Sequence, residues 1–367
     1  VGFIAGTFFC PALIRRVGHI RAFAMFAAVA ASTAILHVLL VEPVIWMLLR
    51  AVTGACLVGL YMVVESWLNT QTPNARRGQV FAVYMAVSLL ALALSQALIT
   101  TADPGGFALF GVASILLSLA LLPVAFTSTA QPLPVTTPRL GLRHLYESSP
   151  AAIAGALASG LVIGAFWGMG PVFAQRIGLD TAGIAAFMSA TILGGAALQW
   201  PIGRLSDRGD RRLVLIFTGA VAGVLALTLA MVASVSVAWL IAVSFLFGGL
   251  AFSVYPISVA HLNDHLQPED ILEGSSGLLL LHGVGAALGP AGVGLLAGYF
   301  GPRSLLVYFA VILGLMAAFL SLRRRRAPPA ALEEHAPFAV MLRTSPEALV
   351  MLADTPEEGL EEAGEPR

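Results

Sequence analysis

Three ionisable side chains inside long apolar runs are the residues of this chain best placed to do chemistry. Arg50 and Glu65 fall within the apolar stretch 43–66, and His282 falls within 274–298. An arginine always keeps its charge, so it needs a partner or water where apolar sequence surrounds it. A carboxylate or an imidazole can carry a proton. Ionisable residues in such runs are typical of a pathway for ions, protons or a polar solute.

One helical face joins Arg50 to Glu65, because steps of three or four residues connect Arg50, Gly54, Leu57, Tyr61 and Glu65. At 1.5 Å per residue, Glu65 lies about 22 Å deeper than Arg50, so the two side chains do not touch. Two interpretations of Glu65 follow. It either accepts a proton, or it stabilises the end of its helix against the arginines that follow.

The composition defines the surroundings of these residues. Of the 367 residues, 58% are apolar and 11% are charged, whereas a soluble domain has about 25% charged residues. This excludes a soluble enzyme, a nucleic-acid-binding protein and a disordered chain. The strands of an outer-membrane barrel alternate in polarity and do not produce such long apolar runs. We therefore expect an all-α polytopic membrane protein in a lipid bilayer.

Apolar runs bounded by charges, Pro or Gly predict eleven helices, of which the first is too short to span. They lie near 1–14, 22–41, 43–66, 79–101, 106–126, 151–175, 182–203, 213–233, 237–260, 274–298 and 303–322. The arginines concentrate at alternate ends of these helices, while the opposite side receives Arg176 and Arg303. The positive-inside rule makes the arginine-rich side cytoplasmic and places the C-terminus there.

The longest interior interruption separates five helices from six. It covers 127–150 and is rich in Pro and Thr. We predict an N-terminal helical bundle over 1–126, a cytoplasmic linker over 127–150, a C-terminal bundle of six helices over 151–326 and an acidic cytoplasmic tail over 327–367.

An internal repeat supports this division. Three residues recur at an offset of 194: Gly54, Tyr61 and Asn69 match Gly248, Tyr255 and Asn263. Two six-helix halves related by an axis along the membrane normal are typical of transporters. The same offset carries the helix at 151–175 to positions before residue 1. We therefore expect that the first helix and part of the second lie upstream of this chain, in a protein of twelve helices.

At a loop signature the chain resembles the major facilitator superfamily. That signature reads Gly, three residues, Asp, Arg or Lys, any residue, Gly, then two of Arg or Lys; the matching residues are Gly203, Asp207, Arg208, Arg211 and Arg212, with Asp210 in place of the second Gly. The first-half copy keeps Arg16 and Gly18. The resemblance implies two pseudo-symmetric six-helix bundles and a gating role at the cytoplasmic mouth for Arg16, Gly18, Gly203, Asp207, Arg208 and Arg211.

A second signature of that family, an Arg followed four residues later by Gly on the fourth helix, is matched by Arg50 and Gly54. The stretches 64–66, 199–205 and 285–290 further resemble a little-characterised group of bacterial inner-membrane permeases. The Gly-Pro motif typical of the fifth helix in drug antiporters is absent from 79–101.

We expect a secondary active transporter that moves a small organic solute across the bacterial cytoplasmic membrane by alternating access. We further expect the transporter to be coupled to protons, to be a monomer, and to need no cofactor or resident metal. The predicted substrate and coupling residues are Arg50, Tyr61, Glu65, Gln96, Trp167 and His282. Other helix residues able to line a cavity are Gln199, Trp200 and Tyr255.

Three alternatives remain. One differs from this expectation in the direction of transport, and two differ in the class of protein. The first is a multidrug or metabolite efflux antiporter, and the second is a receptor or scaffold that does not transport. The third is an intramembrane enzyme, because His261, Asp264 and His265 have a spacing similar to that of an inverted metallopeptidase motif. A surface cluster at a helix end explains the same three residues, so we do not expect an enzyme.

Overall fold

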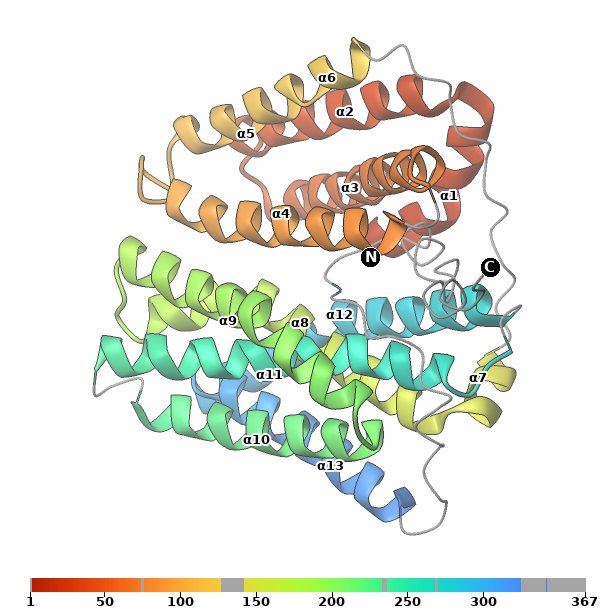
Figure 1. Cartoon of the computed structure of the whole chain (residues 1–367). Helices are drawn as coiled ribbons and strands as arrows, with labels where there is room; N and C mark the ends of the chain where they lie inside the picture. The colour runs from red at the N-terminus through yellow and green to blue at the C-terminus, as the bar shows by residue number, and fades with distance from the viewer. Residues whose placement is uncertain are drawn as a thin grey trace, which may run out of the picture.

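The computed structural model describes residues 2–73, 76–126, 142–232, 236–267, 270–324 and 341. In this part of the chain every regular element is a helix, and ten helices are long and apolar enough to cross a membrane. Figure 1 shows two stacked groups of helices whose axes run in similar directions. The prediction of an all-α polytopic membrane protein is confirmed.

The first group contains the first six helices, which are α1 (Gly2–Val17), α2 (His19–Leu39), α3 (Pro43–Gln71), α4 (Arg77–Leu98), α5 (Phe107–Leu119) and α6 (Leu121–Ala125). Gly18 joins α1 to α2 with a φ of 85°, a left-handed conformation that favours glycine. The single helix predicted over 106–126 is divided into α5 and α6. Pro123 explains the break, because its ring conflicts with the carbonyl of Leu119 four residues earlier.

The second group contains α7 (Leu142–Ser148), α8 (Pro150–Arg176), α9 (Thr181–Asp207), α10 (Arg211–Val232), α11 (Val237–Asn263), α12 (Ile271–Phe300) and α13 (Ser304–Arg324). Capping side chains fix two of the starts. Ser149 Oγ accepts a hydrogen bond from the amide of Ala152, and Asp180 Oδ1 accepts one from the amide of Gly183.

Helix α7 lies inside the predicted linker and was not expected from the sequence. Leu145 on this helix is buried against Ala152 and Tyr255, and such packing stabilises a helix too short to persist alone. Residues 127–141 of the predicted linker lie outside the described residues. Of the predicted tail, only Met341 is described. The domain bounds stay a prediction.

Each group has its own apolar core, and the groups meet along two helix pairs, α4 with α9 and α1 with α12. Leu89 and Ala93 of α4 pack against Ile192 of α9. Ser189 Oγ on α9 donates a hydrogen bond to the carbonyl of Ala93 at 3.1 Å. We call this contact between α4 and α9 the seam.

Arginines gather at one end of the helices, which we call the arginine-rich end. It comprises Arg15 and Arg16 at the end of α1, Arg204 and Arg208 at the end of α9, Arg211 and Arg212 at the start of α10, and Arg323 and Arg324 at the end of α13. By the positive-inside rule this is the predicted cytoplasmic end.

Candidate solute-binding site

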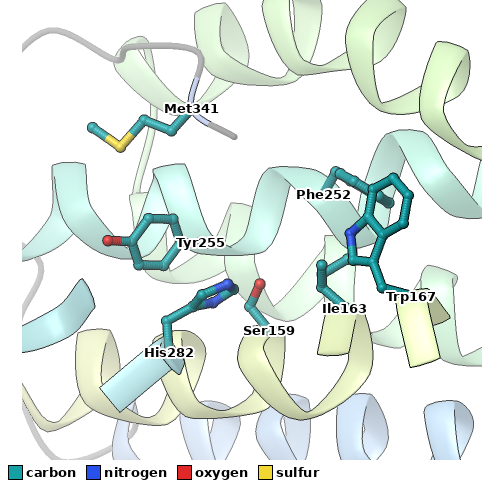
Figure 2. A pocket seen from close by; sticks show the side chains of 7 residues that line it. All are labelled: Ser159, Ile163, Trp167, Phe252, Tyr255, His282 and Met341. Atoms are coloured by element: carbon teal, nitrogen blue, oxygen red, sulfur yellow. The ribbon is translucent and has the colours of Figure 1, made fainter. Parts of the chain in front are cut away.

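A small cavity lies between α8, α11 and α12 (Figure 2). Its lining consists of Ser159, Ile163 and Trp167 from α8, Phe252 and Tyr255 from α11, His282 from α12, and Met341. The volume is about 30 Å³, which is room for one or two water molecules. The cavity in this conformation is therefore smaller than an organic solute.

Two buried hydroxyl groups in this cavity have no hydrogen-bond partner among the described residues. They are Ser159 Oγ and Tyr255 Oη, and their residues are 1% and 4% exposed. More than nine in ten buried polar groups in proteins are hydrogen-bonded, so an exception indicates water, an ion or a ligand. The His282 ring lies beside the Tyr255 ring, with 4.6 Å between the ring centroids. Polar side chains from three helices thus line one cavity, and the Ser159 hydroxyl and the His282 ring face the same part of it.

The cavity is polar in one part and apolar in another. Figure 2 shows the Ser159 hydroxyl and the His282 ring directed toward the same space, with Ile163 and the Trp167 indole beyond them. Phe252 lies above that apolar part. The Tyr255 hydroxyl points away from Trp167. Such a lining suits a molecule with an apolar body and a polar end.

Glycines let α8 and α12 approach closely enough to form this cavity. A Cβ atom added at Gly160 would lie 2.2 Å from the carbonyl oxygen of His282, and one at Gly164 would lie 2.3 Å from Ala286 Cα. Both clashes involve backbone atoms that cannot rotate away. Small residues four apart are a common means of close packing between membrane helices. Glycine at 160 therefore sets the position of His282 relative to α8.

Helix α9 positions the α11 side of the cavity. A Cβ atom at Gly195 would lie 3.0 Å from Phe252 Cγ, so the Phe252 ring rests directly on α9. The buried Gln199 Nε2 donates to the carbonyl of Phe252 at 3.4 Å. Gln199 therefore supports the cavity wall from behind. Trp200 is exposed, and its ring stacks under the Arg204 guanidinium at 3.8 Å.

Two of the predicted substrate and coupling residues, Trp167 and His282, line this cavity together. The other four lie on α3 and α4. Arg50 is exposed on α3, and Tyr61 is half-buried about three turns further along the same helix. Gln96 is half-buried on α4, and its Nε2 donates to Ser95 Oγ at 3.3 Å. Their roles stay predictions.

Glu65 is fully buried in α3 and belongs to a separate polar group. Its Oε1 accepts a hydrogen bond from the Tyr84 hydroxyl of α4 at 3.0 Å. Next to it, Ser66 Oγ lies 3.1 Å from His19 Nε2 of α2. The carboxylate thus ties α3 to α4 in the first group, at a place where it does not line the cavity.

Sequence reasoning missed Ser159, Ile163 and Phe252. A spacing signal was available, because stepping back from Trp167 by four residues reaches Ile163 and then Ser159. Stepping back from Tyr255 by three residues reaches Phe252. Helical spacing places the members of each series on one face of their helix. A face that carries both apolar or aromatic side chains and a hydroxyl is typical of a partly polar cavity wall.

At the arginine-rich end, Arg211 is the centre of a buried ionic network. Its Nε lies 2.8 Å from Asp264 Oδ2 of α11, and its Nη2 lies 3.2 Å from Asp207 Oδ1 of α9. The Arg211 and Asp264 side chains are each 1% exposed. Beside them, Arg324 Nε of α13 contacts Asp210 Oδ2 at 3.1 Å. The predicted residues Asp207 and Arg211 therefore meet, and they join helices of the second group.

The remaining predicted loop residues surround this network or its counterpart. Gly203 is buried within α9, and Arg208 is exposed at the C-cap of that helix. Arg16 is exposed at the end of α1, and Gly18 forms the turn into α2. Their gating roles stay predictions.

The three residues with a peptidase-like spacing are engaged in contacts with their neighbours. Asp264 pairs with Arg211, and His261 Nε2 accepts a hydrogen bond from Arg212 Nε at 3.4 Å. His265 Nδ1 lies 2.8 Å from the carbonyl of His261. Across the described residues, no three side chains of His, Cys, Asp or Glu gather so that they could hold a metal ion.

A bundle of membrane-spanning helices in two groups, with a small half-polar cavity inside one of them, defines a polytopic membrane transport protein as a class. The family model of the Major Facilitator Superfamily matches residues 1–270 and 153–353. The chain belongs to this superfamily of transporters.

Two relatives of this chain are named as transporters of this family. An uncharacterised MFS-type transporter of Enterobacter sp. (strain 638) is 26% identical over 317 residues, which are 85% of this chain and 81% of that protein. The uncharacterised MFS-type transporter YcaD of Escherichia coli O17:K52:H18 is 26% identical over 313 residues, with the same shares. The crystal structure of the E. coli fucose:proton symporter FucP aligns at 14% identity with a TM-score of 0.49, covering 88% of this chain and 89% of the symporter.

Proposed function

We propose that this protein moves a small organic solute by alternating access and that the solute binds between α8, α11 and α12. The observation that carries this proposal is the pair of buried hydroxyls, Ser159 Oγ and Tyr255 Oη, which belong to residues lining one cavity and have no partner among the described residues. Buried hydroxyls cost stability when they are left unpaired. A bound solute or water satisfies them in turn.

Movement between states follows from the size of the cavity. A volume of about 30 Å³ is far below the roughly 300 Å³ or more of a typical ligand pocket. The solute therefore needs a conformation in which the two groups of helices separate. Trp167 supports this link, because it lines the cavity and also packs against the seam residues Leu89, Ala93 and Ile192. A solute that displaces Trp167 would therefore also change the packing at the seam between the two groups.

His282 is the group we propose to carry a coupling proton. It shares the cavity with the proposed solute, so a proton on its ring and a solute are bound in the same state. Tyr255 from α11 and Ser159 from α8 line the cavity beside it, and both are neutral. Glu65 is the second candidate; it accepts a hydrogen bond from Tyr84 within the first group of helices.

The topology completes the proposal. The protein lies in the bacterial inner membrane as a monomer, with the arginine-rich end and the C-terminus on the cytoplasmic side. The clustering of arginines at one end of α1, α9, α10 and α13 supports this orientation. Cysteine-accessibility labelling at Arg323→Cys and Arg303→Cys, which lie at opposite ends of α13, tests it directly.

Proteoliposomes test transport. A pH-sensitive dye inside reports proton movement while a library of metabolites and drugs is added outside. We expect one compound to evoke proton movement, the double variant Ser159→Ala/Tyr255→Phe to lose about tenfold or more of the solute flux, and His282→Gln to lose the coupled proton.

The matched control is Tyr299→Phe, which removes a hydroxyl from an α12 tyrosine that is 86% exposed. This variant keeps both solute flux and proton movement. A double variant as active as the native protein would contradict the proposed site. Unchanged proton movement in His282→Gln would transfer the coupling role to Glu65, and Glu65→Gln then becomes the decisive variant.

A further inference from the structure

The chemistry of the cavity lining identifies the class of solute. We propose that the cavity between α8, α11 and α12 binds small organic monoanions, in which a carboxylate is joined to an apolar ring or chain. This inference rests on the proposed function, because it assumes that the solute binds in this cavity. It adds the charge, the orientation and the polar end of the solute.

The polar groups of the lining are all able to donate hydrogen bonds. The Ser159 and Tyr255 hydroxyls each carry one proton, and the His282 imidazole carries one when neutral and two when protonated. A carboxylate only accepts hydrogen bonds, at two oxygens. Charge-assisted bonds from hydroxyl and N–H donors to a carboxylate are shorter and stronger than neutral ones. The Ser159 hydroxyl and the His282 ring, which face the same space, therefore match an anionic acceptor, and Tyr255 adds a further hydroxyl to the lining.

The described carboxylates lie outside this cavity, which disfavours a cationic solute. Glu65 accepts its hydrogen bond from Tyr84 in the first group, and Asp264 pairs with Arg211 at the arginine-rich end. A cation in the cavity would lose its hydration and gain the faces of Trp167 and Phe252 and the neutral oxygens of Ser159 and Tyr255, with no described carboxylate in the lining to balance its charge. Aromatic faces attract cations, but less strongly than a buried charge needs to replace water.

A protonated His282 supplies the opposite charge that a buried anion needs. The proton comes from the solution on the side where the solute enters and occupies a ring nitrogen. It leaves on the other side together with the anion, so no covalent bond forms or breaks. The pair crosses as a neutral unit, which avoids moving net charge through a low-dielectric interior. Tyr255 and Ser159, which line the cavity beside His282, are both neutral.

The apolar part of the lining sets the body and the orientation of the solute. Ile163, Trp167 and Phe252 form it, on the Trp167 side of the Ser159 hydroxyl and the His282 ring (Figure 2). The carboxylate therefore lies toward Ser159 and His282, and the ring or chain lies against Trp167. A ring stacked on Trp167 also reaches the residue that packs on the seam.

Thermal unfolding with a thiol-reactive maleimide dye tests this assignment. The two free cysteines, Cys10 and Cys56, are 0% and 6% exposed, so the dye reacts only as the fold opens. The probes are benzoate, benzyl alcohol and benzylammonium, which share one ring and differ in the polar group. Each probe is titrated against the native chain and against Ser159→Ala/Tyr255→Phe, with Tyr299→Phe as the control.

We expect benzoate to raise the unfolding temperature at concentrations at least tenfold lower than the other two probes. The double variant should need about tenfold or more benzoate for the same shift, because charge-assisted hydrogen bonds are lost. His282→Gln should likewise need more benzoate for the same shift, because the cationic donor is lost, and should leave the response to benzyl alcohol unchanged.

Three outcomes would overturn the assignment: a stronger response to benzylammonium than to benzoate, a benzoate response that survives in the double variant, or no response to any probe. The proteoliposome experiment separates the two proposals. If another solute still drives proton movement that depends on Ser159 and Tyr255, the transport site stands and only the anion class fails. If neither experiment responds, both proposals fail.

Discussion

Two buried polar regions of the second helix group differ in how their polar atoms are satisfied. At the arginine-rich end, Arg211 lies between Asp207 and Asp264, and Arg324 contacts Asp210. In the cavity, the Ser159 and Tyr255 hydroxyls are buried without a partner among the described residues. In the first region the polar groups form ion pairs that connect α9, α10, α11 and α13. In the second region the two hydroxyls remain able to bind a solute.

Breaking the ionic network should have the largest effect on stability. Arg211→Ala leaves the Asp264 carboxylate, 1% exposed, without its cation, and an unpaired buried charge costs about 3 to 5 kcal/mol. We expect a large fall in the thermal unfolding temperature of the detergent-solubilised protein. The double variant Arg211→Met/Asp264→Leu removes both charges and should recover most of the loss.

The control for this prediction is Arg208→Ala, since Arg208 is exposed at the C-cap of α9. Surface charges contribute little, so the unfolding temperature should stay near that of the native protein. Equal effects of Arg208→Ala and Arg211→Ala would show that the network is not the buried support described above.

Glycine packing beside the cavity gives the next largest effect. Gly160→Ala places a methyl group 2.2 Å from the His282 carbonyl oxygen, so α8 and α12 must move apart. Overpacking of this kind costs about 1 to 3 kcal/mol. We expect a lower unfolding temperature together with a loss of solute flux, because the displacement moves His282.

The matched control is Gly294→Ala on the same α12. A Cβ atom at Gly294 meets nothing within 4 Å, so the substitution is free of clashes. Alanine is the better helix former by about 1 kcal/mol. Unfolding temperature and flux should therefore be unchanged or slightly higher. A Gly160→Ala variant that behaves like Gly294→Ala would mean that α8 and α12 have more freedom than the structure shows.

Breaking the hydrogen bond between Tyr84 and Glu65 should have the third-largest effect on stability. Like the ionic network it connects two helices, and like the cavity it includes a candidate proton carrier. Tyr84→Phe removes one hydrogen bond to a buried carboxylate, which is worth about 1.5 to 3 kcal/mol. We expect a moderate fall in unfolding temperature. If Glu65 only ties α3 to α4, proton movement should persist in Glu65→Gln, which keeps an acceptor for Tyr84. Loss of coupling in Glu65→Gln at native stability would instead make this carboxylate a proton carrier.

The sequence was sufficient for the fold class, because long apolar runs and the placement of arginines depend only on composition along the chain. Trp167 and His282, which stand out against an apolar background in the sequence, both line the cavity, while their roles in solute binding and coupling stay predictions. The helix break before Leu121 and helix α7 were missed. Pro123 gave a signal for the first, whereas α7 depends on the burial of Leu145 by other helices.

The partners of the ionic network could not be predicted in the same way. Asp207 and Arg211 are four residues apart, which a helical turn brings together, but Asp264 lies on another helix. Only the packing of α10 against α11 brings Asp264 to Arg211. Likewise, the Ser159 hydroxyl has no partner among the described residues only because of how the neighbouring helices pack around it. No local pattern encodes that property.

The smallest effect on stability belongs to the cavity hydroxyls, and it sharpens the comparison most. Ser159→Ala and Tyr255→Phe each delete a buried hydroxyl without a partner among the described residues, so no internal hydrogen bond is lost. Removing such a group should leave the unfolding temperature within a degree or two of the native value or raise it slightly. Solute flux should nevertheless fall about tenfold.

Thr218→Val is the contrasting variant, because the buried Thr218 Oγ1 donates to the Val214 carbonyl at 2.8 Å. That variant should lose stability and keep its flux. If Ser159→Ala lost stability in the same way, its hydroxyl would be part of the fold, and the cavity would have to be reassigned as packing.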